Sequence, residues 1–109
     1  MSFEVISVDF FEKQAKRLIK KYPSLKKELE QLKTVLADSP ETGTPLGGGC
    51  YKIRLAIASK NKGKSGGARI ITNVYVSGET VFLLAIYDKA EQQNIAQREL
   101  NELLKLLPD

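Results

Sequence analysis

Histidine and tryptophan are absent from the 109 residues of this chain, and Cys50 is its single cysteine. Without histidine the chain cannot form a Ser-His or Cys-His nucleophile pair, an imidazole acid or base, or a His-ligated zinc site. One cysteine excludes an intrachain disulfide and a CxxC metal knuckle. Any catalysis is therefore left to lysine, arginine, tyrosine, carboxylates, hydroxyls and backbone groups.

Long apolar runs are also absent. The chain has no run of about 18 apolar residues, which is the length that a membrane-spanning helix needs. Its first residues also lack the basic and apolar regions of a signal peptide. Hydrophobic residues make up 42% and charged residues 28% of the chain, as in ordinary globular proteins. We therefore expect a cytoplasmic protein with a single domain over residues 1–109.

Acidic residues are missing from the middle of the chain. Residues 42–78 contain six lysines and arginines and no aspartate or glutamate, although the net charge of the whole chain is only +4. Such a basic block is typical of proteins that bind a polyanion, most often a nucleic acid. A solvated basic loop is the alternative, and charge alone does not separate the two.

Hydrophobic periodicity predicts the order β-α-α-β-β-β-α, which is an α+β fold with a small, largely antiparallel sheet and two N-terminal helices on one face. Strands are expected over 3–8, 51–58, 69–76 and 81–87, and helices over 11–22, 25–36 and 100–107. The near-continuous apolar run of 81–87 predicts burial on both faces. Segment 41–49, with three consecutive glycines, is expected to be a loop, and Asp88 and Glu91 are interpreted as residues that start the last helix.

Five polar side chains are expected near one another on the three later strands. Lys52 and Arg54 alternate with apolar residues, so they share a face and lie about 7 Å apart along the strand. Arg69 begins the next strand, and Tyr87 and Lys89 close the last one. Cations gathered on one face repel one another unless an anion binds there. One guanidinium group can donate two parallel hydrogen bonds to the oxygens of a phosphate. The pattern indicates a phosphate site on the face that the N-terminal helices do not cover.

Three segments resemble the RelE/ParE toxin superfamily, and within it the RelE/HigB-like branch. They are CYKIRL at 50–55, GKSGGARII at 63–71 and LLAIYDKAE at 83–91, and the likeness extends over nearly the whole chain. The resemblance implies a RelE-like fold of the microbial ribonuclease type and a toxin of a type II toxin–antitoxin system. It implies a metal-free, ribosome-dependent mRNA endoribonuclease without cofactors, whose partners are a cognate antitoxin, mRNA and the ribosome.

The resemblance also implies roles for the basic residues. Lys52 and Arg54 match a basic pair with roles in proton abstraction and phosphate binding. Arg69 matches an arginine that would stabilise the phosphorane transition state. Lys89 falls where a basic residue follows the last strand and would protonate the leaving 5′-oxygen or bind phosphate.

One position departs from this pattern. Some members carry a tyrosine six residues after the last basic position, where this chain has Ile95, so Tyr87 is the candidate for stacking or proton donation. Lys60, Lys62 and Lys64 are expected to contact phosphates of messenger or ribosomal RNA.

Two alternatives stay open at this point. A ParE-like toxin would inhibit DNA gyrase without nuclease activity, although many such relatives lack the basic set. A non-catalytic RNA-binding module would bind RNA in a salt-sensitive way and release no cleavage product.

Overall fold

The order of elements along the chain matches the expected order, with one added strand. In this computed structural model residues 2–60 and 66–107 are described. The elements are β1 (Glu4–Ser7), α1 (Asp9–Lys21), α2 (Leu25–Asp38), β2 (Thr44–Gly47), β3 (Cys50–Leu55), the 3-10 turn η1 (Ala58–Lys60), β4 (Ala68–Tyr75), β5 (Thr80–Asp88) and α3 (Gln97–Leu104). The predicted α+β class is confirmed, and most boundaries lie within three residues of the expected ones.

The strands form one mixed sheet in the order β1-β5-β4-β3-β2. Three of its four pairings are antiparallel, and β1 pairs with β5 in parallel. The sheet is therefore largely antiparallel, as predicted. β5 lies between β1 and β4, and all nine of its residues are buried, which confirms the predicted burial on both faces.

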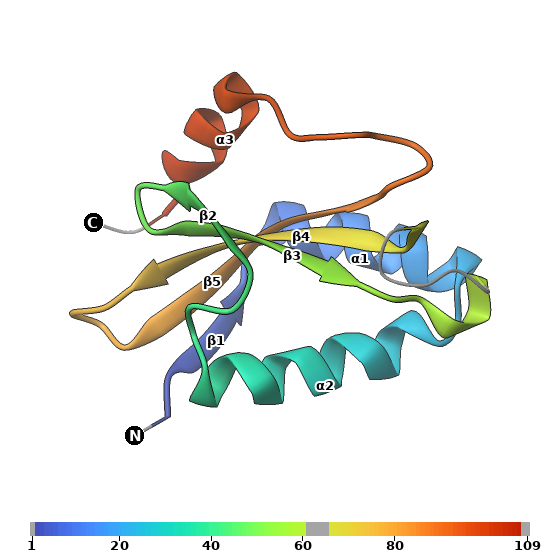
Figure 1. Ribbon diagram of the computed structural model, residues 1–109, viewed down its shortest axis with the longest axis horizontal. Helices are drawn as coiled ribbons and strands as arrows, with labels where there is room; N and C mark the ends of the chain where they lie inside the picture. The colour runs from blue at the N-terminus through green and yellow to red at the C-terminus, as the bar shows by residue number, and fades with distance from the viewer. Residues whose placement is uncertain (1, 61–65, 108–109) are drawn as a thin grey trace.

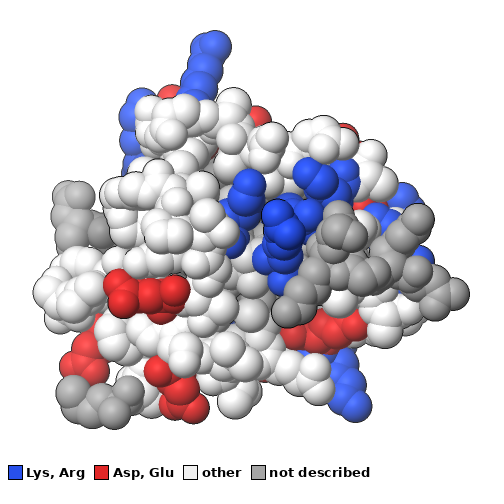
Figure 2. All heavy atoms as spheres, viewed as in Figure 1, with Lys and Arg blue, Asp and Glu red and all other residues white. Residues whose placement is uncertain are grey.

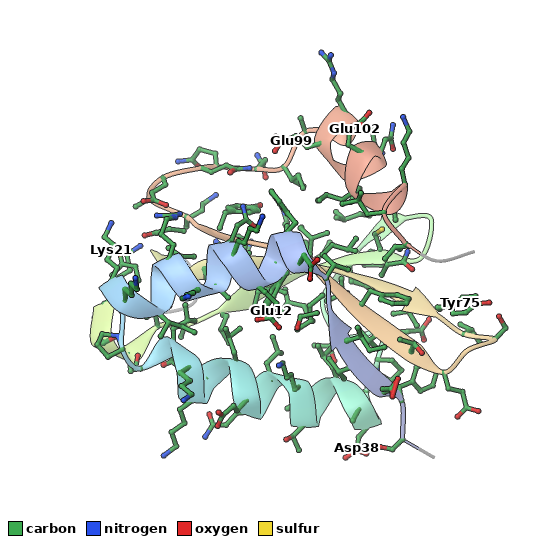
Figure 3. The ribbon with its side chains drawn as sticks, turned by 180° about the vertical axis from the view of Figure 1, so that it is seen from behind. Glu12, Lys21, Asp38, Tyr75, Glu99 and Glu102 are labelled. Carbon is green, nitrogen blue, oxygen red and sulfur yellow. The ribbon has the colours of Figure 1, made fainter. Side chains whose placement is uncertain are left out.

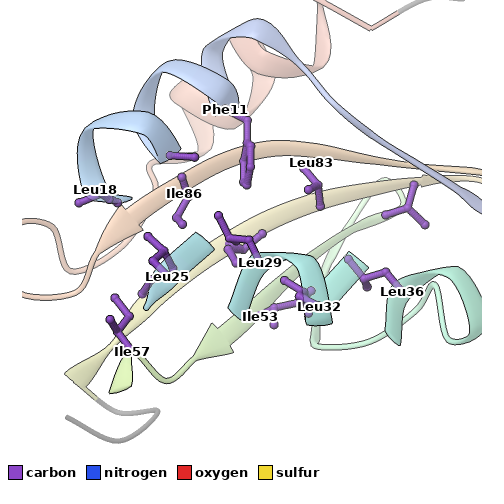
Figure 4. Close-up of a cluster of buried hydrophobic side chains, with 14 residues drawn as sticks. Phe11, Leu18, Leu25, Leu29, Leu32, Leu36, Ile53, Ile57, Leu83 and Ile86 are labelled. Atoms are coloured by element: carbon purple, nitrogen blue, oxygen red, sulfur yellow. The ribbon is translucent and has the colours of Figure 1, made fainter. Parts of the chain in front are cut away.

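Helices α1 and α2 cover one face of the sheet because each is amphipathic. Leucines recur every three or four residues in α2, and its buried positions are Leu25, Leu29, Leu32 and Leu36. Together with buried residues of α1 they pack on side chains of β3, β4 and β5, which Figure 4 shows for Ile53, Leu83 and Ile86 among others. The prediction of two N-terminal helices on one face is confirmed.

Helix α3 packs on the opposite face (Figure 1). Its buried residues Leu100 and Leu103 join a second apolar cluster with Cys50, Ile71 and Tyr87. Seen from behind, α1 and α2 lie in front of the sheet, with Lys21 near one end of the molecule and Tyr75 at the other (Figure 3). None of the helices in residues 2–60 and 66–107 has the length and apolar character needed to cross a membrane.

The expected loop over 41–49 is wrong in part, because Thr44–Gly47 forms β2 at the edge of the sheet and pairs with Cys50–Lys52. β2 is held in the sheet by backbone hydrogen bonds to β3. Pro45 lacks a backbone N–H group, and it is tolerated because β2 is an edge strand with a bulge next to Pro45. Gly43 turns the chain into β2 with a φ of +108°, and a Cβ at this position would lie 2.6 Å from the Lys52 carbonyl oxygen. The side-chain pattern therefore carried no signal for this strand.

The interpretation of Asp88 and Glu91 as the start of the last helix is also wrong. Asp88 is the final residue of β5, and α3 begins nine residues later at Gln97. The connection over 89–96, orange in Figure 1, runs out from the end of β5 and turns back toward α3. This connection passes close to the candidate site described next.

Candidate functional site

A row of three polar side chains crosses the sheet on the face away from α1 and α2. Arg54 on β3 is paired with Arg69 on β4, and Arg69 is paired with Tyr87 on β5. Residues directly opposite in an antiparallel ladder share a face and have Cβ atoms about 4.5–5.5 Å apart. The register therefore brings together three of the residues that the sequence singled out.

Burial increases along this row. Arg54 is exposed, whereas Arg69 and Tyr87 are each only 4% exposed. The Arg69 guanidinium donates a hydrogen bond to the carbonyl oxygen of Ala68 at 3.2 Å. Electrostatic interactions are stronger in such a water-poor setting than in bulk water, so a charge on Arg69 would act strongly on a nearby phosphate.

The hydroxyl of Tyr87 is buried and makes no hydrogen bond to any residue that the structure describes. Burial raises the pKa of Tyr87, and Glu99 adds to that rise while Arg69 opposes it. Tyr87 therefore keeps its proton at neutral pH and can donate a hydrogen bond, although it is a weaker acid than an exposed tyrosine.

The two lysines of the predicted site, Lys52 and Lys89, each donate a hydrogen bond to a residue of the 89–96 connection. Lys52 lies two residues before Arg54 on β3 and therefore on the same face of the sheet. Its Nζ donates a hydrogen bond to Oδ1 of Asn94 at 3.3 Å. Nζ of Lys89 donates to the carbonyl oxygen of Gln93 at 3.1 Å. Both acceptors are neutral, so an anionic phosphate oxygen would be a stronger partner for either ammonium group.

Basic side chains also gather visibly in the middle of the face that Figure 2 presents, which has the orientation of Figure 1. Within the described ranges, no group of three or more His, Cys, Asp or Glu side chains is placed to hold a metal ion. The charged groups of the site are cationic, which suits binding of a phosphate.

Lys60 does not join this row, and Lys62 and Lys64 lie outside the described residues. Lys60 ends η1 and forms an ion pair with Asp88, and the two side chains are only 11% and 0% exposed. The positive charge of Lys60 is therefore paired with the carboxylate of Asp88. Sequence reasoning missed this pair, although an aspartate that ends a doubly buried strand is a signal that a buried partner is needed.

Ile95 packs at the edge of the apolar cluster beneath α3. Some members of the family that the chain resembles carry a tyrosine at this position. The nearest phenol on the site's own row is that of Tyr87, which belongs to the same apolar cluster.

Comparison with known proteins identifies the family of this chain. The family model of the RelE toxin of the RelE/RelB toxin–antitoxin system matches residues 5–107. A double arginine-to-alanine mutant of the E. coli toxin RelE in the free state has a similar structure, with a TM-score of 0.66 and 20% sequence identity over 98% of this chain and 100% of that one. A crystal structure of the isolated E. coli RelE toxin is similar with a TM-score of 0.61 and 17% identity over 97% and 100% of the two chains. The chain belongs to the RelE toxin family.

Proposed function

We propose that this protein is the toxin of a type II toxin–antitoxin pair and cleaves mRNA on the ribosome as a metal-free endoribonuclease. The observation that carries the proposal is the row formed by Arg54, Arg69 and Tyr87, with Lys52 beside it, in a chain of the RelE toxin family. A cationic face with a buried, protonated phenol suits an RNA phosphate that gains charge during the reaction.

The proposed step is an attack by the 2′-hydroxyl of the RNA on the adjacent phosphate. The bond from the 2′-oxygen to phosphorus forms as the bond from phosphorus to the 5′-oxygen breaks, which leaves a 2′,3′-cyclic phosphate and a 5′-hydroxyl. Lys52 binds the phosphate as an ammonium group or, when it is deprotonated, accepts the 2′-hydroxyl proton, and Arg54 binds the phosphate. Arg69 stabilises the added negative charge of the phosphorane from its buried position.

The leaving 5′-oxygen needs a proton. Tyr87 is the candidate donor because its phenol lies beside Arg69 on the row and carries its proton at neutral pH, although burial raises its pKa and so makes it a weaker acid than an ordinary tyrosine. Lys89 follows β5 directly and supplies a second positive charge, either to the phosphate or to the leaving oxygen.

The antitoxin is the proposed inhibitory partner. An acidic or amphipathic segment of an antitoxin would complement the basic block over residues 42–78 and would cover Lys52 and Arg54, the more exposed cations of the site. Covering this face would block phosphate access without any change in the fold of the toxin.

The test is addition of the purified protein to translating ribosomes, followed by mapping of mRNA ends. Cleavage should fall by about 100- to 1,000-fold in Arg69→Ala, because a preorganised donor to the transition state is lost. Lys105→Ala is the control, since Lys105 is exposed and pairs only with Glu102 at 3.2 Å among the described residues. Intact mRNA at stoichiometric protein would contradict the proposal, and inhibition of supercoiling by gyrase in its place would support the ParE-like alternative.

A further inference from the structure

Asp88 is the meeting point of three parts of the chain that are distant in sequence. Its carboxylate accepts hydrogen bonds from Nζ of Lys60 in η1, from the hydroxyl of Tyr22 just after α1 at 2.8 Å, and from the backbone N–H of Ala90 at 2.9 Å. The side chain is 0% exposed. A fully buried carboxylate is stable in its ionised form only with such partners.

Lys60 is committed to this contact. Its Nζ also lies 5.5 Å from the centroid of the Tyr22 ring, so the neighbours of the ammonium group among the described residues are protein groups on the helix side of the sheet. An RNA phosphate would have to displace a buried carboxylate to reach it. Lys60 is therefore better suited to hold the fold at this point than to bind RNA.

The position of Asp88 within β5 gives the contact a functional meaning. Side chains alternate between the faces of a strand, so Asp88 faces the helices while Tyr87 faces the candidate site. The backbone nearby is fixed as well, because the Asp88 carbonyl accepts the N–H groups of Glu91 and Gln92 at 3.0 Å each. The N–H of Lys89 donates to the Gly67 carbonyl at 3.0 Å.

We propose that Lys60, Asp88 and Tyr22 form a positioning network, which holds the end of β5 so that Tyr87 and Lys89 face the RNA phosphate. This inference rests on the proposed function. None of the three residues touches the substrate, and they act through the two site residues that flank Asp88. Burial alone would raise the pKa of Asp88, but the hydrogen bonds from Lys60, Ala90 and Tyr22 lower it overall, so the carboxylate stays ionised at neutral pH.

The test compares Lys60→Met with Lys21→Met. Both lysines lie over the Tyr22 ring, at 5.5 and 5.4 Å, but Lys21 is exposed and its Nζ is 3.7 Å from Glu91. Single-turnover cleavage of mRNA on stalled ribosomes separates the saturating rate from the half-saturating concentration. The saturating rate should fall by about 10- to 100-fold in Lys60→Met, as for other small misplacements of reacting groups, with the half-saturating concentration unchanged. Lys21→Met should behave as the wild type.

A second measurement reports on position directly. The amide resonances of Tyr87 and Lys89 and the phenol resonance of Tyr87 should shift in Lys60→Met and stay in place in Lys21→Met. Tyr22→Phe removes one hydrogen bond to Asp88 and keeps the ring, so it should fold and show a smaller effect of the same kind. This variant keeps the test decisive if Lys60→Met is unfolded.

Two outcomes would overturn the inference while the proposed function stands. One is a folded Lys60→Met or Tyr22→Phe protein with wild-type rate and resonances, which would make the network a stabilising contact only. The other is a raised half-saturating concentration with an unchanged rate, which would make Lys60 an RNA contact. A wild-type protein that leaves mRNA intact would instead overturn the proposed function itself.

Discussion

Arg54 and Arg69 lie directly opposite each other on the neighbouring antiparallel strands β3 and β4. Like charges in this arrangement destabilise a sheet, and here one of the two guanidinium groups is also buried. An anion bound at this row would offset such repulsion. The row therefore combines a stability penalty with the capacity to bind a phosphate.

Substitution of Arg54 by glutamine should relieve this repulsion. We expect Arg54→Gln to raise the free energy of unfolding by about 0.2–1 kcal/mol, the range for cross-strand pairs, and to slow mRNA cleavage. Urea unfolding and single-turnover cleavage measure the two effects. Arg98→Gln, an exposed position on α3, is the control for loss of one positive charge. A loss of stability in Arg54→Gln alone would show that Arg69 does not repel Arg54.

Tyr87→Phe should separate stability from activity. The variant removes a buried hydroxyl that has no hydrogen-bond partner in the described structure, so the free energy of unfolding should rise by about 1 kcal/mol. Cleavage should fall because the proposed proton donor is lost. The matched control is Tyr51→Phe, which removes an exposed hydroxyl that donates to Glu41 at 3.0 Å. Equal cleavage rates for the two variants would exclude proton donation by Tyr87.

Acid should weaken the fold through Asp88. Its folded-state pKa lies below that of the unfolded chain, so the ionised carboxylate stabilises the protein above about pH 4. That contribution is lost as the pH falls through the folded-state pKa. Asp88→Asn should flatten the decline of unfolding free energy at acidic pH. At neutral pH it should cost about 3 kcal/mol, because the buried charge of Lys60 is left uncompensated.

The measurement is urea unfolding between pH 2 and pH 7, with the pH range chosen around the ordinary pKa of aspartate, about 3.9. Glu91→Gln serves as the control. Its hydrogen bond with Arg17 also lowers the pKa of Glu91, but that pair is exposed and should contribute little. A wild-type acid dependence in Asp88→Asn would contradict the assignment.

Gly67→Ala should disturb both the fold and the site. A Cβ at Gly67 would lie 2.1 Å from the carbonyl oxygen of Leu55, so β3 and β4 would have to move apart at the end that bears the row. We expect a loss of about 1–3 kcal/mol, as for other overpacked positions, and slower cleavage. Gly48→Asn is the comparison, because nothing lies within 4 Å of its Cβ and asparagine tolerates the φ of +63°. Equal stability of the two variants would contradict this expectation.

The parts of the fold that depend on side-chain periodicity could be predicted from the sequence. The leucine spacing of α2 and the alternation through Lys52 and Arg54 both match the structure, because each pattern records which face is buried. β2 was missed because an edge strand is held by backbone hydrogen bonds, and its Gly- and Pro-containing sequence is typical of a turn.

The candidate site was predictable to the same extent. Arg54, Arg69 and Tyr87 share a row because strand order and alternation determine it, and both could be read from the sequence. The contact between Lys60 and Asp88 could not be predicted, because it joins residues 28 positions apart through the path of η1. Nothing in the sequence of the basic block indicates that Lys60 pairs with Asp88.

The pairing of β1 with β5 has a consequence for how the protein is made. Glu4 is aligned with Thr80, so the first strand finds its neighbour only after most of the chain has been synthesised. β5 also supplies a large part of the surface on which α1 packs, as well as Tyr87 and Asp88. A nascent chain that ends before residue 80 therefore lacks β5, the strand that joins β1 to the rest of the sheet. Such long-range pairing forms late, so the proposed nuclease should gain its chemistry only after β5 has been synthesised.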